Sequence, residues 1–345
     1  MNKIFKNSLL VLGLIIFALI IFCGFYYWQI YKSINGIGKQ TIYIIEGEGV
    51  NEVANKLSEK GLIRSALFFK IHLFLLNKHH QITPGTYEFS GDQNAASIIF
   101  DIIDGNVAED KVTIIEGWRK EQIAGLLSSY GLSEKDFLKE ATEVKKYKSL
   151  FPFLENFKIE KDLEGFLFPD TYQFMKNENA ESIVTKMLKS FQQKVWEQYD
   201  FKKATKLSSY DYIKLAAIIE REIPNQNDRK KVAGLYLNRI ANNMKLDADP
   251  TVQYAKETAN PPKSYKNYWQ EISISDYQKW SGDYNTYLMF GFPKTPICNP
   301  GAKAIESVLN AEENDYLYFF NSPDGKTIFS KTLEEHNKNK NKYLN

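Results

Sequence analysis

The 345-residue sequence predicts an α+β protein that follows one membrane-spanning helix at its N-terminus. Three observations lead to this prediction: a long uncharged segment near the start, a strand-turn-helix pattern that occurs twice, and helical periodicity interrupted by short aromatic segments in the rest of the chain. Hydrophobic residues make up 43% of the chain, which is enough for two or three folded units. We expect a tail and membrane helix over 1–33, a small α+β domain over 40–108, and a mixed helical and strand domain over 110–345.

The membrane helix is predicted from Asn7 to Tyr31, where 25 positions carry no charged residue. About 20 apolar residues cross a bilayer as a helix, so this segment can cross with some tilt. Lys3 and Lys6 precede it, which favours a cytoplasmic N-terminus and export of the residues that follow the helix. Aromatic residues typical of a membrane interface gather at its far end: Phe25, Tyr26, Tyr27, Trp28 and Tyr31. A cleaved signal peptide is the alternative, which we disfavour because no small-x-small site follows the apolar run.

The small domain contains the first copy of an internal repeat, and the second copy follows at an offset of 70 residues. The matching positions are Ile44-Ile45-Glu46-Gly47 with Ile114-Ile115-Glu116-Gly117, and Ala54, Leu57, Gly61 and Leu62 with Ala124, Leu127, Gly131 and Leu132. Each copy predicts a short strand, a glycine turn, an amphipathic helix and a glycine that ends the helix. The first copy continues into a turn within 82–90 and a helix near 94–104 that ends at Gly105.

The larger domain is predicted to begin with mainly helical structure over 134–200. Within it, the segment 163–174 differs, because Gly165 and Pro169 interrupt an aromatic cluster and indicate a loop or short strand. The elements expected after it are a helix, loop and helix over 210–243, a loop over 245–255, a helix near 302–311, a strand over 316–320, and a tail rich in lysine and asparagine.

Charge and composition exclude several classes of function. Lys and Arg total 44 against 42 Asp and Glu, a net charge of +2, so nothing indicates the concentrated basic surface of a nucleic-acid binder. The four histidines show no metal-ligand spacing, and we therefore expect no metal and no cofactor. The two cysteines, Cys23 and Cys298, are expected in different compartments and cannot pair.

Two glutamates, Glu220 and Glu222, lie two residues apart in the apolar run AAIIEREI (216–223), so on a helix they point to different sides. The bulky apolar residues on the side of Glu222 are Leu215, Ile218 and Ile219. The residues beside Glu220 are Ile213, Ala216 and Ala217, where small side chains permit close approach or exposure. Burial raises the pKa of a carboxyl group, and a glutamic acid that is protonated near neutral pH is suited to general acid catalysis. Glu222 is therefore the candidate acid.

A structural role for Glu222 is the alternative, because buried acidic groups are usually paired with a cation. The candidate partners are Arg221, Arg239 and Lys245. Spacing alone leaves both interpretations open.

Several motifs occur in order along the chain. They are Glu164-Gly165, Phe168-Pro169-Asp170-Thr171, Glu220-Arg221-Glu222, Val232-Ala233, Asn238-Arg239, Asp249-Pro250-Thr251-Val252, Tyr284-Asn285-Thr286-Tyr287, Gly291, Pro293 and Pro300-Gly301. Together with the single span and the segment Pro84-Gly85-Thr86-Tyr87, they resemble the YceG-like family over nearly the whole chain. The members of that family are membrane-anchored endolytic murein transglycosylases. The resemblance implies a LysM-like domain over 40–108 and a YceG-like catalytic domain over 110–345.

The resemblance also implies a reaction. The family cleaves the β-1,4 bond between N-acetylmuramic acid and N-acetylglucosamine inside peptidoglycan strands without water, and its essential glutamate corresponds to Glu222. One carboxyl group is enough, since it first protonates the glycosidic oxygen and then accepts the proton of the muramic acid 6-hydroxyl, which attacks C1. The product end is 1,6-anhydro-N-acetylmuramic acid. The sequence departs from the family pattern at Ile223, where a small hydroxyl residue is common, and at Asp247, where glutamine is more usual.

The residues expected to bind substrate or support the acid are Asn238, Arg239, Asp249, Thr251, Tyr284, Asn285, Tyr287 and Asp170. Aromatic faces suit sugar rings and amides suit acetamido groups, although the same residue types also pack cores and shape turns. Asp249 before proline and threonine is a good turn residue, which makes a structural role the favoured one for it.

The expected location is the cytoplasmic membrane, with one span and the catalytic domain on the extracytoplasmic side. The expected partners are peptidoglycan strands, nascent ones above all, together with membrane-bound peptidoglycan synthases. Two other functions stay open. One is a hydrolytic muramidase that uses Asp247 or Asp249 with water. The other is a non-catalytic peptidoglycan-binding scaffold in which Glu222 forms a structural ion pair.

Overall fold

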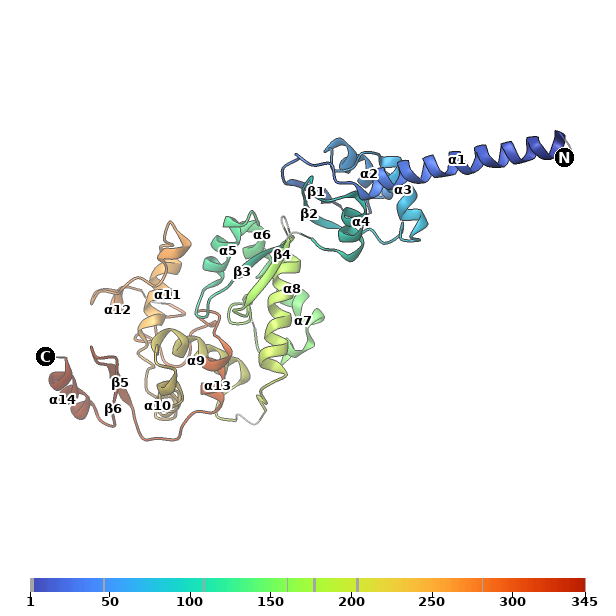
Figure 1. The fold of residues 1–345 in the computed structure, drawn as a ribbon. Coiled ribbons are helices and arrows are strands. Elements are labelled where there is room, and N and C mark those ends of the chain that lie inside the picture. The colour runs from blue at the N-terminus through green and yellow to red at the C-terminus, as the bar shows by residue number, and fades with distance from the viewer. Residues whose placement is uncertain are drawn as a thin grey trace. The chain divides into compact units, whose positions relative to one another are not determined.

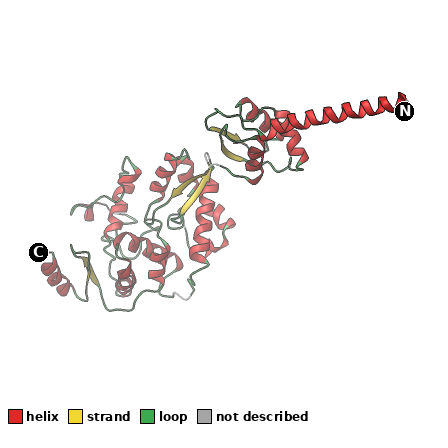
Figure 2. Cartoon of the chain, viewed as in Figure 1, coloured by secondary structure: helices red, strands yellow, loops and turns green. Residues whose placement is uncertain are grey.

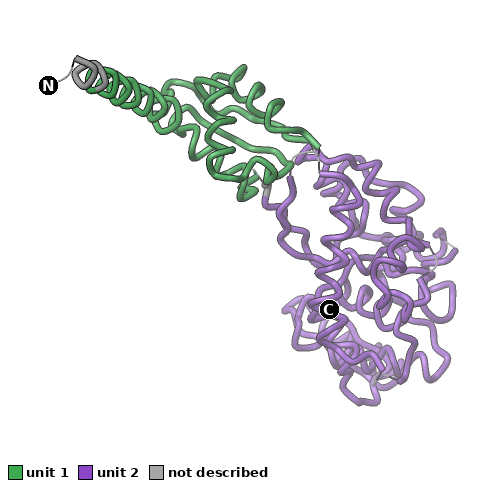
Figure 3. Tube along the Cα trace, turned by 90° about the vertical axis from the view of Figure 1, so that its right-hand side faces the viewer, with its two compact units in different colours: residues 1–110 green, residues 111–345 purple. Residues whose placement is uncertain are grey.

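The computed structural model describes residues 3–45, 47–107, 109–159, 161–175, 178–202, 205–280 and 282–344, so Glu46 of the repeat lies outside the described residues. The chain divides into two compact units, Met1–Asp110 and Lys111–Asn345 (Figure 3). Both units contain helices and small two-stranded sheets, and helices predominate (Figure 2). The predicted α+β class is confirmed.

Unit 1 begins with the long helix α1 (Lys3–Tyr31). Its part from Leu9 to Tyr31 is long and apolar enough to cross a membrane, and it lies near the N-terminus, so a membrane anchor and a signal sequence both fit it. The apolar residues of α1 are exposed along most of its length, but Ile30 in its last turn is fully buried in the core of unit 1. The last turn of α1 is therefore part of the folded unit.

The rest of unit 1 is a small α+β fold (Figure 1). Its other elements are β1 (Gln40–Ile44), α2 (Val50–Glu59), α3 (Ala66–Leu75), β2 (Gly85–Phe89) and α4 (Ala95–Asp104). β1 and β2 are antiparallel, with Ile42 opposite Tyr87. The core between this sheet and the helices contains Val53, Leu57, Phe69 and Ile98. The helix predicted near 94–104 is confirmed, and Gly105 follows it in the left-handed conformation.

Unit 2 contains most of the helices. They are α5 (Lys120–Ser129), α6 (Glu134–Glu140), α7 (Val144–Leu150), α8 (Ala180–Phe191), α9 (Ser209–Glu222), α10 (Arg229–Ala241), α11 (Asp249–Ala259), α12 (Asp276–Lys279), α13 (Ala302–Leu309) and α14 (Leu333–Tyr343). The strands after residue 108 are β3 (Glu109–Thr113), β4 (Thr171–Met175), β5 (Tyr318–Asn321) and β6 (Thr327–Ser330). Short helical turns occupy Pro152–Asn156, Gln192–Trp196, Gln226–Asp228 and Tyr265–Asn267. β3 pairs with β4, and β5 pairs with β6.

The predicted repeat is visible in the structure as two strand-turn-helix segments, β1 with α2 and β3 with α5. Corresponding apolar residues are buried in both copies, including Leu57 and Leu127. Gly61 and Gly131 follow the two helices with φ of 72° and 79°, a conformation that glycine adopts without strain. The prediction of a repeated supersecondary element is confirmed.

Helix α9 lies at the centre of unit 2 and packs against α10, α11 and α13 (Figure 1). Ser208 caps its N-terminus by accepting a hydrogen bond from the backbone N–H of Asp211 at 3.1 Å. The buried residues of α9 are Tyr210, Tyr212, Ile213, Leu215, Ala216, Ala217, Ile218 and Ile219. Because apolar neighbours surround α9 on nearly all sides, a charged residue at its end must be paired or must reach a cavity.

Two predicted segments differ from the structure. The loop expected over 245–255 ends early, because α11 begins at Asp249, and Pro250 is well suited to the first turn of a helix, where its missing N–H is not needed. The Lys- and Asn-rich tail contains helix α14, whose start is capped by Thr332 and carries Glu334 and Glu335 in its first turn. The helix-loop-helix over 210–243 is confirmed as α9 and α10.

Candidate active site

The two glutamates of the run AAIIEREI have different surroundings at the end of α9. Glu220 accepts a hydrogen bond from Arg229 Nη2 at 2.6 Å, and its other oxygen accepts one from the backbone N–H of Gly301 at 2.9 Å. Its side chain is only 5% exposed. The sequence suggested close approach or exposure on this side of the helix, and the structure shows a buried, fully paired carboxylate. Glu220 therefore links α9 to the starts of α10 and α13.

Glu222 is the last residue of α9 and opens onto a cavity of about 500 Å³. The cavity is lined by Glu222, Arg239, Leu246, Asp247, Asp249, Tyr277, Tyr287, Tyr318, Phe319, Phe320, Asn321, Leu333, His336, Asn337 and Lys340. Glu222 is partly exposed, in contrast to the buried residues that precede it on α9. Its carboxyl group is thus recessed in the protein and lines the cavity at the end of α9.

The pKa of Glu222 is raised from its ordinary value of 4.5 to about 8. Burial is the main cause, because it disfavours the charged form, and the negative charge of Asp249 adds to the rise. The positive charge of Arg239 opposes it. Among the described residues, none donates a hydrogen bond to the Glu222 carboxyl group or forms an ion pair with it. Glu222 is therefore protonated at neutral pH and free to donate its proton into the cavity.

The three cations considered as ion-pair partners of Glu222 are used elsewhere. Arg239 forms an ion pair with Asp247 at 3.1 Å, while Arg221 stacks on the ring of Trp269 at 4.3 Å from its centre. Lys245 donates to a backbone carbonyl oxygen, that of Tyr287, at 2.9 Å. A structural ion pair thus does not account for Glu222 in the part of the chain that the structure describes.

Arg239 is a bracing residue of the cavity wall as well as a nearby positive charge. Its Nε donates to the carbonyl oxygen of Leu317 at 2.7 Å, and its Nη1 donates to that of Leu246 at 2.8 Å. These bonds join α10 to the residue before β5 and to the segment that precedes α11. Its guanidinium is nearly buried, and further bonds to the carbonyl oxygen of Lys245 and to Asp247 offset the cost of that burial.

Asp249 is held by two tyrosines across the cavity wall. Its Oδ1 accepts hydrogen bonds from the hydroxyl groups of Tyr287 at 2.7 Å and Tyr277 at 3.1 Å. The two rings meet edge to face with centroids 4.6 Å apart. Burial and the adjacent carboxylate raise the pKa of Tyr277 to about 12, so it stays a hydrogen-bond donor. The sequence assigned Asp249 a turn-capping role, whereas its carboxylate faces the tyrosines of the cavity.

Three of the predicted supporting residues lie behind this wall rather than in it. Asn285 is fully buried: its amide donates to the carbonyl oxygens of Tyr277 and Trp280, and its Oδ1 accepts from the N–H of Tyr287. Thr251 is also fully buried and bonds to the carbonyl oxygen of Ala248 and the hydroxyl of Thr286. Tyr284 is buried, with its hydroxyl 3.1 Å from that of Thr295. These side chains shape the loops that carry Tyr277, Tyr287 and Asp249.

The other two predicted residues lie away from the cavity lining. Asn238 donates to the carbonyl oxygens of Asn314 at 2.7 Å and Tyr316 at 3.1 Å, which fastens the segment before β5 to α10. Asp170 bonds to Lys194 at 2.6 Å and caps the start of β4. Among the predicted set, the structure therefore brings Glu222, Arg239, Asp249 and Tyr287 together at one cavity.

The C-terminal segment supplies cavity residues that the sequence did not suggest. They are Tyr318, Phe319, Phe320 and Asn321 from β5 and Leu333, His336, Asn337 and Lys340 from α14 or its start. Tyr318 and His336 stack with ring centroids 5.4 Å apart. The capping signals of α14 were present in the sequence, but nothing local connected that helix with Glu222, more than a hundred residues earlier.

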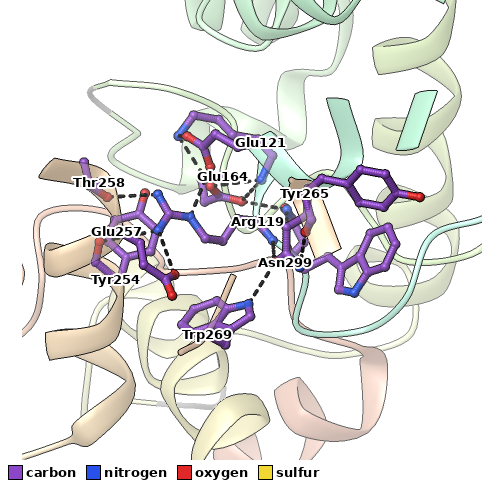
Figure 4. A network of polar contacts seen from close by, with 12 residues as sticks. Arg119, Glu121, Glu164, Tyr254, Glu257, Thr258, Tyr265, Trp269 and Asn299 are labelled. Carbon is purple, nitrogen blue, oxygen red and sulfur yellow. Dashed lines mark hydrogen bonds and ion pairs between the residues drawn. The ribbon is translucent and has the colours of Figure 1, made fainter. Parts of the chain in front are cut away.

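Another buried glutamate, Glu164, resembles Glu222 in its raised pKa but not in its contacts (Figure 4). Burial raises its pKa to about 8. Its oxygens accept from the backbone N–H of Lys120 at 3.0 Å and from Asn299 Nδ2 at 2.7 Å. The side chain is fully buried and lies outside the lining of the Glu222 cavity. Glu164 therefore holds its own segment to the start of α5 and to the segment that contains Asn299.

Arg119 forms the centre of the same network (Figure 4). Its Nη2 donates to Thr258 at 2.9 Å, its guanidinium lies 3.9 Å from the ring centre of Tyr254, and Glu257 is 3.7 Å away. All three partners belong to α11, whose first residue is Asp249. The network anchors α11 to the start of α5 and so positions Asp249 from the far end of the helix.

The arrangement can perform acid–base chemistry with one carboxyl group. Glu222 is protonated, unpaired and accessible from the cavity, while Asp247 and Asp249 are engaged by Arg239 and the tyrosines. In the described residues, no group of three or more His, Cys, Asp or Glu side chains is placed to hold a metal ion. The chemistry available is thus proton donation to a bound oxygen, followed by proton acceptance from a second one.

A family model and several known proteins are similar to this chain over most of its length. The model of the YceG-like family matches residues 42–342. A Bacillus subtilis protein named endolytic murein transglycosylase is 30% identical over 314 residues, which cover 88% of this chain and 84% of the relative. A Streptococcus pneumoniae protein of the same name is 26% identical over 330 residues, and the match spans 58% of that longer protein. A crystal structure of a yceG-like protein from Listeria monocytogenes is similar with a TM-score of 0.57 and 32% identity, over 87% of this chain and 98% of that one.

Proposed function

Because this chain belongs to the YceG-like family, we propose that it is an endolytic murein transglycosylase, a lyase that cleaves peptidoglycan glycan strands at internal bonds. The names of the similar proteins support the enzyme class, and the cavity at the end of α9 supports the site. The single observation that carries the assignment of the acid is the carboxyl group of Glu222. It is protonated at neutral pH, unpaired among the described residues, and open to the cavity.

In the proposed reaction, Glu222 donates its proton to the oxygen that joins C1 of N-acetylmuramic acid to N-acetylglucosamine. The C1–O bond breaks through an oxocarbenium-like state, and the N-acetylglucosamine end leaves as an alcohol. The Glu222 carboxylate then accepts the proton of the muramic acid 6-hydroxyl as that oxygen bonds to C1. The product is a 1,6-anhydro end, the acid is regenerated, and no water is consumed.

The surroundings of Glu222 suit both halves of this cycle. The raised pKa keeps the carboxyl group protonated before bond cleavage, and the charge of Arg239 limits the cost of the carboxylate that follows. Asp249 contributes a negative charge beside the site where positive charge develops on the sugar ring. Its two tyrosine hydroxyl donors hold that carboxylate in place.

The membrane helix is proposed as a retained anchor. α1 continues without a break into the core of unit 1 through Ile30, so cleavage after the apolar segment would remove part of a folded unit. Lys3 and Lys6 precede the span, and positively charged flanking residues favour the cytoplasmic side. We therefore place the N-terminus in the cytoplasm and unit 2 on the extracytoplasmic side of the cytoplasmic membrane. This confines cleavage to the membrane-proximal layer, where nascent strands and their membrane-bound synthases lie. Within unit 1, residues 1–33 are the proposed tail and membrane helix and residues 40–108 the proposed LysM-like domain, and residues 110–345 are the proposed catalytic domain.

The test is digestion of purified peptidoglycan by the full-length chain in detergent, with the products identified by mass spectrometry. The whole chain is used because removal of residues 1–33 would take Ile30 out of the core of unit 1. Glu222→Gln is the inactive variant, and Asp170→Asn is the matched control, a carboxylate outside the cavity lining. Ends in 1,6-anhydromuramic acid that disappear only with Glu222→Gln support the proposal. Ordinary reducing ends would instead assign a hydrolase, in which Asp247 or Asp249 acts with water. No cleavage by the folded wild type would favour a non-catalytic scaffold.

A further inference from the structure

Helix α3 (Ala66–Leu75) exposes apolar residues that the fold of unit 1 does not cover. Its buried side faces the core through Phe69, His72 and Leu73. Its exposed residues include Leu67, Phe74 and Leu75, whose side chains are 58%, 59% and 70% exposed. Leu67 and Phe74 are seven positions apart and lie on one face of the helix, and Leu75 widens this exposed surface by about 100° around the helix axis. A helix whose outer face is apolar as well as its inner face is expected to contact a second apolar environment, such as a partner protein or a membrane.

The neighbour of α3 indicates which environment this is. Phe68 of α3 contacts α1 through Phe22 and Phe25, with ring centroids 6.4 and 5.4 Å apart. The Tyr26 hydroxyl of α1 is 2.5 Å from Nδ1 of His72. Figure 1 shows α3 beside α1 at the end of unit 1 from which the rest of α1 projects. The exposed apolar surface of α3 is therefore continuous with that of the membrane-spanning helix.

The length of α1 places α3 at the edge of the bilayer. The uncharged segment starts at Asn7, and about 20 residues at about 1.5 Å each are needed to cross the hydrocarbon core. Counted from Asn7, the twentieth residue is Tyr26, which contacts α3 directly. Because α1 is one uninterrupted helix from Lys3 to Tyr31, no linker allows α3 to move away from that level.

The charges around α3 fit a lipid surface. The segment 62–81 contains Arg64, Lys70 and Lys78 and no acidic residue. Arg64 lies over the ring of Trp28 in α1 at 4.7 Å from its centre, at the end of α1 that carries the aromatic residues. Basic side chains beside an apolar helix face are typical of helices that lie in the interface of membranes with anionic lipids.

We propose that α3 lies in the outer surface of the bilayer that α1 crosses, with Leu67, Phe74 and Leu75 in contact with lipid. Unit 1 is then docked on the membrane by two helices, one that spans it and one that lies in its surface. The inference rests on the proposal that α1 is retained as an anchor, but not on the identity of the catalytic residue. The consequence is that unit 1 keeps a fixed orientation to the membrane instead of rotating about a single span.

The test measures the depth of single positions in the full-length chain, reconstituted in vesicles of phosphatidylethanolamine and phosphatidylglycerol. Cys23 and Cys298 are replaced by alanine, and one cysteine is introduced at Leu75, Tyr43 or Leu12 and labelled with an environment-sensitive fluorophore. Tyr43 is the matched control, an exposed aromatic residue on β1 at the other end of unit 1 (Figure 1). Leu12 reports on the span itself. Quenching is compared for lipids that carry a nitroxide near the headgroup or deep in the acyl chain.

The expected result is several-fold stronger quenching at Leu75 than at Tyr43 by the shallow nitroxide, and quenching at Leu12 by the deep one. Equal, weak quenching at Leu75 and Tyr43 with deep quenching at Leu12 would overturn the docking of α3 and leave the anchor intact. Absence of quenching at Leu12 would overturn the retained anchor and the docking together. The three labelled positions are exposed, so the label does not enter the core of unit 1, and the buried Cys298 that is replaced belongs to the core of unit 2.

Discussion

Arg239 donates a hydrogen bond from Nη1 to Asp247 Oδ2 at 3.1 Å, and it lies beside Glu222 without pairing with it. In a direct ion pair, Arg239 would be neutralised by Glu222 and would strongly lower the pKa of Glu222. Arg239 is neutralised by a different carboxylate, so its charge lowers the pKa of Glu222 only in part, and the net pKa stays near 8. The acid therefore keeps its proton at neutral pH although a guanidinium is close by.

The first prediction concerns the pH dependence of the wild-type enzyme. Cleavage requires the protonated form of Glu222, whose pKa is about 8, so kcat/KM should fall as the pH rises through about 8. Asp247→Asn removes the charge that neutralises Arg239, which strengthens the attraction between Arg239 and a Glu222 carboxylate and lowers the pKa of Glu222. The alkaline limb of the profile should then move to lower pH by about 1 unit.

The measurement is kcat/KM from pH 5 to 10 with soluble glycan chains. Asp170→Asn, which also removes one carboxylate but lies outside the cavity, should leave the limb in place. A limb that does not move in Asp247→Asn would show that Asp247 does not act on Glu222 through Arg239.

The second prediction concerns stability and the same carboxyl group. The pKa of Glu222 is higher in the folded protein than in the unfolded chain, so its contribution to stability is present below about pH 4.5 and is lost as the pH rises through about 8. Glu222→Gln keeps the shape of the side chain and removes the titration. The variant should melt at the same temperature as the wild type near pH 4.5 and higher than it at pH 8.5, by roughly 2–4 °C for each kcal/mol gained.

Differential scanning fluorimetry at both pH values measures this difference, and the cleavage assay measures the accompanying loss of activity, about 10²-fold or more. If Glu222→Gln melted below the wild type at pH 8.5, Glu222 would be a stabilising structural carboxylate and the scaffold interpretation would gain support.

The third prediction concerns Glu220 and Arg229, whose side chains are 5% and 6% exposed and 2.6 Å apart. Removal of one partner leaves a buried charge without its counterion, so Glu220→Ala should lower the free energy of unfolding by about 3–5 kcal/mol. The double variant Glu220→Ala with Arg229→Met should recover part of that loss, because no unpaired charge remains.

Chemical unfolding of the wild type, Glu220→Ala, Arg229→Met and the double variant completes the double-mutant cycle. The exposed pair Lys326–Asp324 provides a comparison, and Asp324→Ala should change the free energy of unfolding far less than Glu220→Ala does, because water screens an exposed pair. Equal losses for Glu220→Ala and Asp324→Ala would mean that the Glu220 pair does not hold α9 in place.

The fourth prediction concerns Tyr287, which donates to Asp249 at 2.7 Å. Tyr287→Phe keeps the ring on Tyr277 and removes one of two hydroxyl donors to the carboxylate. The looser Asp249 should reduce kcat about tenfold with little change in KM, because its charge acts on the transition state rather than on the bound glycan. Tyr284→Phe, which removes a hydroxyl behind the wall, is the matched control and should keep kcat.

The parts of the site that could be predicted from the sequence were those that depend on the helical pattern of apolar residues in one segment. Glu222 interrupts the apolar stripe of one helix, so its recessed position follows from residues within two turns. Its raised pKa also depends on Asp249 and Arg239, which belong to other helices. The pairing of Glu220 could not be predicted in the same way, because Arg229 and Gly301 come from other segments. Asp249 was assigned to a turn because the tyrosines that bind it lie 28 and 38 residues later.

The fold shows the same division. Each copy of the repeat, the long apolar N-terminal helix and the helix pair α9–α10 follow from patterns within about 35 residues, and all of these elements are present. The cavity wall formed by β5 and α14 required long-range contacts, such as that of Arg239 with the carbonyl oxygen of Leu317, 78 residues apart. The Lys- and Asn-rich composition of the tail did not indicate a helix, although Thr332 and Glu335 supply the capping signals that begin α14.

The last prediction concerns α14 as a substrate-binding wall. Lys340 lines the cavity from the far end of this helix and carries a positive charge that can donate hydrogen bonds to oxygen atoms of a bound glycan or its peptide. Lys340→Ala should raise KM about tenfold and leave kcat unchanged, since the lost interaction is present equally in the ground state and the transition state. Lys338→Ala is the matched control, because Lys338 is exposed on the same helix but does not line the cavity. Steady-state kinetics with glycan chains of defined length separate KM from kcat, and melting curves verify that both variants fold. A fall in kcat with unchanged KM would place Lys340 in the reaction itself, whereas equal kinetics for the two variants would remove α14 from the binding surface.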